Sequence, residues 1–594
     1  MKRKVVTLFL VLLTLTGLFL RSYNLNWGSP YFFHPDERNI ASAVLNINFP
    51  DSLNPHFFAY GAFPIYLVSL MNRFIGLFLK TSSYDHFALA ILVGRFFSAI
   101  LSTALIPLVF ILTKKILATL NNWSNGSDRV DLINKDFWAL VAAFLTAFNP
   151  GLIQYAHFST FEIFLTIEYL LMTIFAIEIA LTGKKRFYLL TGLLLGLACA
   201  TKINSLMFVP VLFLAHWFNP NPKSNQSLLT AFATFVLVAF FASPFNLLDF
   251  SELKSALNYE SSVALGNLAV FYTQGFLKTT PILFQFKSVF PFLWGWSLTI
   301  LGILGGLGML AMVLRDKLQT NRAKVLLIFI SVPLTYWLFN SFLFVQWMRY
   351  SVPLIPFVII AAIIFFFKFF KVPPSGRWNL KGITLLLALV LSTSISGITM
   401  FLTYREPDTR IQAAKWLAEQ SRAEPRGDPS RSTEQTHILS EVYDLGITPF
   451  NTYFDPSTIS LFDFYGLDPD PRLQFNPKQT ALDKKSKLEE LSRLLEKSDY
   501  IVLPSPRIWR TRLRLPNEFP SNSSFYQKLF DGNLGFVKVA DFQNKACDKF
   551  LAIRCLWLND DNAEETYTVF DRPEVLIFQK EEPLLAPEYY RIII

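Results

Sequence analysis

The sequence predicts an all-α polytopic membrane domain followed by a smaller C-terminal α/β domain. Apolar residues make up 52% of the 594 residues and charged residues only 16%, whereas soluble chains carry roughly 25% charge. This shortage of charge is confined to residues 1–402, where apolar runs of membrane-spanning length follow one another. Residues 403–594 have the composition of an ordinary soluble domain. We therefore expect the chain to change character near Tyr404.

About eleven apolar runs predict transmembrane helices. The first follows the basic N-terminal residues, and because no small-residue cleavage site comes after Leu20, we expect an uncleaved helix. A further apolar stretch, 60–79, is interrupted by Gly, Pro, Asn and Arg residues, which favours a helix lying along the membrane surface. The predicted spans are 5–20, 86–113, 137–153, 161–181, 187–201, 203–218, 228–247, 291–314, 325–343, 350–367 and 382–402.

Basic residues predict the orientation of these spans. With the N-terminus in the cytoplasm, the Lys- and Arg-rich turns all fall on the cytoplasmic side, as the positive-inside rule requires. A span at 60–79 would invert that pattern, so we exclude it. The prediction is a multi-pass protein of the cell membrane whose long segments outside the cytoplasm are the loops 21–85 and 248–290 and the domain 403–594, with short turns between the other spans.

The C-terminal domain alternates between the periods of helices and strands. Its two cysteines, Cys547 and Cys555, have a spacing that permits a disulfide outside the cytoplasm without requiring one. The net charge of +10 resides mostly in short membrane turns, so we expect no nucleic-acid partner. The predicted helices are 408–420 and 484–497, and the predicted strands are 437–440, 500–503, 535–540, 567–570 and 575–578.

The first outer loop contains two adjacent acidic residues in the segment Phe33-His-Pro-Asp-Glu-Arg-Asn39. A carboxylate held at the membrane edge can take a proton from a hydroxyl group. Alternatively, Pro35 fits the first position of a helix, and Asp36 and Glu37 fit its first turn, where the helix dipole favours anions. The two roles are compatible, because a residue in the first turn can also act as a base.

Short motifs follow this acidic pair in a fixed order along most of the chain. Taken together, they resemble the GT-C superfamily of glycosyltransferases, and within it the protein O-mannosyltransferases and the bacterial aminoarabinose transferases that act on lipid A. The order and the topological placement of the motifs carry the resemblance, rather than any single one. The motifs are Tyr60-Gly-Ala-Phe-Pro64, Gly94-Arg95-Phe96, Ala200-Thr-Lys-Ile203, Met348-Arg-Tyr-Ser-Val-Pro-Leu-Ile-Pro356 and Asp408-Thr-Arg410.

The resemblance implies a GT-C fold and an inverting transfer of a sugar from a polyprenyl-phosphate donor, a membrane lipid, to a protein, lipid or glycan acceptor. It implies Asp36 as the catalytic carboxylate, with Glu37 beside it. The departing phosphate needs cations, because stabilising developing charge is usually the largest catalytic term. Arg95, Lys202 and Arg349 are the candidates, and Tyr350 accompanies Arg349 in its motif. Alternatively, Lys202 extends to the membrane interface, and Arg95, inside its span, has a structural partner.

The second outer turn adds two candidates for binding substrate, His157 and Glu162. Relatives often have aspartate where Glu162 stands, but Ser159 and Glu162 also form the pattern of a helix capping box. Glu168 lies within a predicted span, where a carboxylate is a functional candidate. His157 and Glu260 either line the site or are ordinary loop residues.

We predict no cofactor. The first loop lacks a DxD pair, which favours metal-independent chemistry and leaves a divalent metal open, and no nucleotide-binding, serine hydrolase or zinc protease motif is present. The alternative function is a polytopic transporter or lipid flippase, which would show broken or charged spans in paired halves. A membrane-anchored binding protein is a third possibility. The sequence indicates neither the sugar nor the acceptor.

Overall fold

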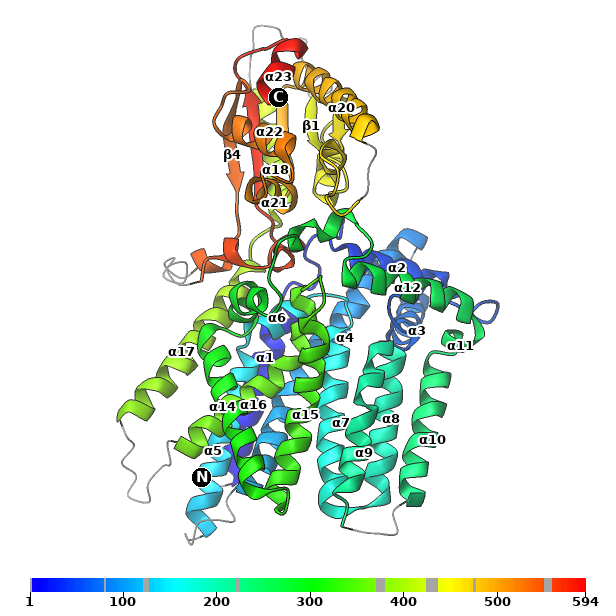
Figure 1. Cartoon of the computed structure of the whole chain (residues 1–594), viewed down its shortest axis with the longest axis vertical. Coiled ribbons are helices and arrows are strands. Elements are labelled where there is room, and N and C mark those ends of the chain that lie inside the picture. Colours follow the sequence, from blue (N-terminus) through cyan, green and yellow to red (C-terminus); the bar gives the residue numbers. More distant parts are fainter. Residues whose placement is uncertain are drawn as a thin grey trace.

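The computed structural model describes residues 3–79, 82–120, 128–220, 225–369, 380–423, 436–473, 477–549 and 558–594. It shows a bundle of long helices with the C-terminal domain stacked on one end, which we call the domain-facing end (Figure 1). The N-terminus lies towards the opposite end of the bundle. The protein is thus a multi-pass helical membrane protein that carries a compact domain on one side.

Each of the eleven predicted spans lies on a helix. By length and composition, nine helices of the described ranges are able to cross a membrane, or up to ten if α5 and α6 (Pro150–Ala156), which are bent by 50°, form one span. That count includes α3 (Ala62–Leu79) and leaves out the shorter α8 and α9. The helices on the predicted spans are α1 (Arg3–Ser22), α4 (Ser83–Leu120), α5 (Asp128–Ala147), α7 (Glu162–Thr182), α8 (Lys185–Thr201), α9 (Val209–Trp217), α10 (Asn225–Ala242), α14 (Trp296–Asp316), α15 (Asn321–Ser341), α16 (Ile355–Phe369) and α17 (Leu380–Thr403).

Helix α3 starts against the C-terminal end of α8. The Gly61 amide donates a hydrogen bond to the Thr201 carbonyl at 2.9 Å, and a Cβ at Gly61 would lie 2.0 Å from the Ala200 carbonyl oxygen, so only glycine fits. Large apolar side chains of α3, such as Leu70 and Leu77, are exposed. Exposed apolar side chains suit a helix in contact with lipid, and its placement along the membrane surface remains a prediction.

A five-stranded sheet with the order β2-β1-β3-β5-β4 forms the centre of the C-terminal domain. β1 pairs parallel with β2 and β3, whereas β5 pairs antiparallel with β3 and β4. Side chains alternate between two apolar cores, one under α18 and the other under α20, α22 and α23. The elements are α18 (Thr409–Ala423), β1 (Ile438–Glu441), β2 (Ile459–Phe462), α20 (Pro477–Lys497), β3 (Tyr500–Leu503), α22 (Pro520–Phe530), β4 (Phe536–Phe542), β5 (Val575–Lys580) and α23 (Ala586–Ile593).

Two details of this domain differ from the sequence prediction. Residues 567–570 are the end of a 3₁₀ helix (Glu565–Tyr567) and the turn after it instead of a strand. Tyr567 is buried in the core of the helix bundle, where Gln154 donates a hydrogen bond to its carbonyl. The edge strand β2 was not predicted, since it is half-exposed and lacks a clear alternation. Cys547 is disulfide-bonded. Cys555, with which the sequence permits but does not require a disulfide, lies outside the described residues.

The buried carboxyl of Glu441 makes the stability of this domain depend on pH. Glu441 ends β1, and its Oε1 accepts a hydrogen bond from the Tyr526 hydroxyl at 2.7 Å. Burial raises the pKa of Glu441 from 4.5 to about 8. The folded domain therefore keeps a proton that the unfolded chain releases, so the free energy of unfolding falls as the pH rises between these two values.

We predict that Glu441→Gln removes this dependence, because the amide keeps the shape of the carboxyl and never ionises. Amide hydrogen exchange of β1 and β3 is to be compared in the two proteins at about pH 5 and about pH 8. The variant is expected to match the wild type at the lower pH and to be better protected at the higher one. Equal protection at both values would contradict the prediction.

Candidate active site

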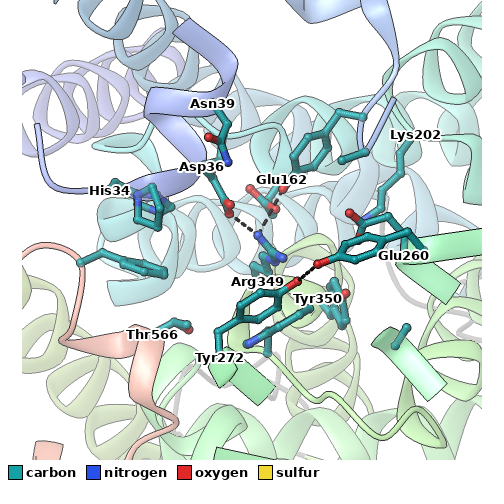
Figure 2. Close-up of a pocket in the computed structure, with 18 of the residues that line it drawn as sticks. His34, Asp36, Asn39, Glu162, Lys202, Glu260, Tyr272, Arg349, Tyr350 and Thr566 are labelled. Carbon is teal, nitrogen blue, oxygen red and sulfur yellow. Dashed lines mark hydrogen bonds and ion pairs between the residues drawn. The ribbon is translucent and has the colours of Figure 1, made fainter. Parts of the chain in front are cut away.

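A cavity of about 740 Å³ lies between the domain-facing end of the bundle and the C-terminal domain. Its volume is in the range of about 300–1,000 Å³ typical of ligand sites. The wall on the membrane side comes from the first outer loop, the start of α7, the end of α8 and the turn before α16. The opposite wall comes from α12 (Phe250–Leu265), the second outer loop and the C-terminal domain. Segments from the whole length of the chain therefore meet here (Figure 2).

Asp36 and Arg349 meet at the centre of this cavity. Asp36 is in the first turn of α2 (Pro35–Asn46), with Pro35 in the first position as the sequence predicts. Arg349 belongs to the 3₁₀ helix η4 (Met348–Leu354), and its Nη1 forms an ion pair with Asp36 Oδ2. The same nitrogen donates a hydrogen bond to the Tyr60 hydroxyl at 3.2 Å. Figure 2 shows Arg349 pointing at Asp36, with Glu162 beside the pair.

The charges around Asp36 keep its carboxyl ionised. Burial alone would raise the pKa of Asp36, but Arg349, His34 and Lys202 together outweigh it and hold the pKa below its usual range. The carboxylate is partly exposed to the cavity, with a side-chain exposure of 25%. A molecule that entered the cavity would therefore meet a deprotonated carboxylate whose basicity is limited by Arg349.

Lys202 supplies a second cation on the same side of the cavity. It lies between α8 and the 3₁₀ helix η1 (Ile203–Phe208), and its Nζ lies 5.0 Å from the centre of the Tyr350 ring and 5.6 Å from that of Tyr60. Within the described part of the chain, Lys202 forms no ion pair. Burial, followed by repulsion from Arg349, lowers its pKa. An anion bound between Lys202 and Arg349 would offset both the cost of burying the ammonium and its repulsion from the guanidinium.

Two further carboxylates face the cavity, Glu162 and Glu260. Glu162 begins α7 and is buried, and its Oε2 has no hydrogen-bond partner among the described residues. The predicted capping box is not formed, since the cap position is Phe161 and the Ser159 amide donates to Glu37 instead. Glu260 comes from α12 across the cavity, and burial raises its pKa. Glu162 is therefore available for a ligand rather than used as a cap.

Glu37 and Arg95 do not line the cavity. They form a fully buried ion pair in which Arg95 Nε lies 2.8 Å from Glu37 Oε1 and Nη2 lies 2.6 Å from Oε2. Arg95 Nη1 also donates to the carbonyls of Leu25 and Trp27 at 2.7 and 2.9 Å. The structural alternative that the sequence left open for Arg95 is thus the observed one, and Glu37 shares it. The pair fastens the first outer loop to α4.

His157 is likewise absent from the cavity wall. Its ring nitrogens contact the carbonyl oxygens of Ile153 and Tyr23 at 2.8 and 2.9 Å, and its ring stacks on Tyr404 at 3.7 Å. These contacts join the bundle to the end of α17. Glu168 also lies outside the cavity, with its Oε1 accepting a hydrogen bond from Thr201 Oγ1 at 2.9 Å.

The structure adds wall residues that sequence reasoning missed. His34 and Tyr60 belong to the motifs discussed above, so their positions were visible although their contribution to the wall was not. The C-terminal domain contributes further wall residues; of these only Arg410 belongs to a motif named above, and the others gave no signal because they come from separate segments with no shared pattern. The wall residues from this domain are Arg410, Tyr443, Asp444, Arg507, Thr566 and Phe570.

One group of described residues away from the cavity has donors suited to a divalent metal. His56, Asp249 and Glu252 each offer one ligand atom, and these three atoms lie within 4.8 Å of one another. His56 Nδ1 already lies 3.0 Å from Glu252 Oε2, and Asn54 donates to Asp249 at 3.0 Å. None of the three lines the cavity.

No protein-family model matches the chain, and no curated protein matches it. Among solved structures, it is similar to ArnT from Cupriavidus metallidurans bound to undecaprenyl phosphate, with 13% identity, a TM-score of 0.40 and coverage of 97% of this chain and 98% of that one. The apo state of ArnT gives 14% identity, a TM-score of 0.39 and coverage of 86% and 94%. The arabinofuranosyltransferase AftD from Mycobacteria gives 13% identity and a TM-score of 0.38; the likeness covers 98% of this chain but 42% of AftD.

ArnT and AftD are both GT-C glycosyltransferases, the superfamily that the sequence motifs resemble. At these identities, the similarity concerns the fold.

We predict that Glu37→Gln destabilises the protein far more than Asp36→Asn does. The first change leaves Arg95 buried without a counter-charge, which costs about 3–5 kcal/mol, whereas Asp36 and Arg349 both face the cavity and its solvent. The fraction of folded protein after heating, followed by size-exclusion chromatography, measures the difference. Equal melting temperatures for the two variants would show that the buried pair does not anchor the loop.

Proposed function

We propose that the chain is a GT-C glycosyltransferase that moves a sugar from a polyprenyl-phosphate donor to an acceptor hydroxyl on the extracytoplasmic face. The observation that carries the proposal is the meeting of one carboxylate, Asp36, with two cations, Arg349 and Lys202, in a cavity at one end of a membrane bundle. Transfer of a sugar from a phosphate needs these two functions together: a base for the acceptor and positive charge for the leaving group.

The two cations form the site for the donor phosphate. The planar guanidinium of Arg349 can hold two phosphate oxygens, and the ammonium of Lys202 adds a point charge. Apolar side chains, Phe339 and Leu343 at the end of α15 together with Leu257 and Leu265 of α12, line the same cavity and suit a prenyl chain. A lipid phosphate therefore matches this side of the cavity in both charge and polarity.

Phosphate binding also prepares the base. In the free protein, Arg349 pairs with Asp36 and keeps its pKa low. A phosphate that shares Arg349 and Lys202 neutralises part of this charge, so the basicity of Asp36 rises when the donor is in place. Asp36 then takes the proton of the acceptor hydroxyl as that oxygen bonds to the anomeric carbon. The bond from this carbon to the phosphate oxygen breaks, and the configuration at the carbon inverts.

The basic turns support the proposed orientation. Figure 1 places the turn between α7 and α8 and the turn between α14 and α15 at the end away from the C-terminal domain. These turns and the helix ends beside them contain Lys184, Lys185, Arg315 and Arg322. The positive-inside rule assigns that end to the cytoplasm, so the cavity faces the other compartment. A transporter or flippase, the alternative, would need polar groups along its path, whereas the cavity gathers them at one end.

We predict that Asp36→Asn lowers transfer by about 10²–10⁴, since the amide keeps the size of the side chain but accepts no proton. Release of polyprenyl phosphate from a panel of polyprenyl-phosphate hexoses and pentoses, in proteoliposomes, measures the effect. Asp51→Asn is the matched control, because Asp51 is an exposed carboxylate of the same loop that lies outside the cavity. Wild-type rates in the Asp36 variant would reject the proposed base.

We also predict that Lys202→Gln weakens inhibition by the product polyprenyl phosphate by about 10–100-fold, the value of one charge-assisted contact. The inhibition constant in the same assay is the measurement. Lys254→Gln, which changes an exposed lysine of α12 outside the cavity, is the control, and we expect it to leave the inhibition constant unchanged. An unchanged inhibition constant in the Lys202 variant would place the phosphate elsewhere.

A further inference from the structure

Tyr443 lies on the cavity wall that the C-terminal domain contributes, and its backbone conformation is unusual. It follows β1, and its backbone has φ 69°, in the left-handed region that bulky residues rarely occupy. Its side chain is 62% exposed, although it lines the cavity. Burial in a core therefore does not account for the strained backbone. Strain of this kind at a cavity wall points to a functional position.

The exposed ring of Tyr443 belongs to an aromatic platform. It stacks on Phe271 with ring centres 4.9 Å apart and planes inclined by 22°. Phe271 starts the 3₁₀ helix η2 (Phe271–Phe276) of the second outer loop, and Tyr465 of the C-terminal domain packs against it at 4.9 Å. The loop and the domain thus build the platform together, and they hold the Tyr443 ring against the cavity.

Planar polar side chains lie next to this platform. The Asp444 carboxylate is fixed by hydrogen bonds from the Gly446 amide, at 2.7 Å, and from the Ser505 hydroxyl. Arg507 donates from Nε to Glu565 Oε1 at 3.0 Å, and its two Nη groups form no hydrogen bond with a described residue. Both Asp444 and Arg507 line the cavity. They offer an acceptor and donors, already oriented, beside an exposed ring.

We infer that the acceptor of the proposed transfer is a saccharide, whose sugar ring packs on Tyr443 and hydrogen-bonds to Asp444 and Arg507; this rests on the function proposed above. A sugar has a face of C–H groups that suits an aromatic ring and neighbouring hydroxyls that suit a carboxylate or a guanidinium. An anionic headgroup fits less well, because Glu565 already balances Arg507. An extended peptide fits less well too, since neither edge strand of the sheet, β2 or β4, lines the cavity.

The position of this subsite suits transfer. Tyr443 and Asp36 line one continuous cavity, on walls formed by different parts of the chain. In Figure 2, Thr566 of the C-terminal domain lies on the other side of Arg349 from Lys202. A sugar held on the C-terminal side would present a hydroxyl towards Asp36, while the donor phosphate occupies the side of Lys202. Acceptor and donor thus approach from opposite sides of the base.

The test is binding of a panel of methyl disaccharides of glucose, mannose, galactose and arabinose to the full chain in lipid nanodiscs free of glycoside detergent. Saturation-transfer NMR detects binding without turnover. Tyr443→Gly removes the ring and suits the positive φ, so the fold is expected to be kept, as a melting curve verifies. Tyr443→Phe keeps the ring and is the matched control. We expect at least one disaccharide to bind, with about tenfold weaker affinity in the Gly variant and near wild-type affinity in the Phe variant.

Equal affinity of the wild type and the Gly variant overturns the inference, and so does the absence of binding by every disaccharide. Binding of a serine- and threonine-rich peptide that Tyr443→Gly weakens, without disaccharide binding, overturns it in favour of a protein acceptor. Donor turnover, measured on the same preparations, tests the proposed function separately. Disaccharide binding that depends on Tyr443 supports the subsite whether or not turnover depends on Asp36, so the two failures are distinguishable.

Discussion

The buried ion pair between Glu37 and Arg95 is the interaction on which the site depends. Asp36 and Glu37 are adjacent in the first turn of α2, and the ion pair between Glu37 and Arg95 anchors that turn to α4. Successive residues of a helix point about 100° apart, so once Glu37 is fixed towards α4, Asp36 must point elsewhere. It points into the cavity and meets Arg349. The Glu37–Arg95 pair is fully buried, whereas both side chains of the Asp36–Arg349 pair are partly exposed to the cavity, where a ligand can reach them.

The cavity is complete only because the C-terminal domain sits on the bundle. Glu564 of that domain accepts a hydrogen bond from the Met348 amide at 3.0 Å, directly beside Arg349. Gln274 of the second outer loop donates to Asp470 at 3.1 Å and accepts from Arg512 at 2.6 Å, which ties that loop to the same domain. The domain therefore positions both Arg349 and the loop that contributes Phe271 to the aromatic platform. Its removal would leave the base without its opposite wall.

Hydropathy predicted the apolar helices of the bundle, because the bilayer imposes a length and a composition on each. It did not fix the number of spans, since α3, which the sequence assigns to the membrane surface, is also long and apolar enough to cross, and α8 and α9 are shorter. It was not enough to distinguish Asp36 from Glu37, or to show that Arg95 is paired, since these outcomes depend on which way neighbouring side chains face after packing. The wall residues Tyr443, Asp444 and Arg507 follow no period or motif, and only the sheet topology brings them to the cavity. The edge strand β2 was missed because it is half-exposed and its sequence shows no clear alternation of apolar and polar residues.

A structure of the full chain with bound polyprenyl phosphate, determined by electron cryomicroscopy, would show whether Arg349 leaves Asp36 to hold the donor phosphate. We predict phosphate density between Arg349 and Lys202, with the Arg349 guanidinium turned from Asp36 to the phosphate and the prenyl chain beside the apolar residues of α12 and α15. Phosphate density at the other end of the bundle, or an Arg349–Asp36 pair that remains closed with the lipid bound elsewhere, would contradict it.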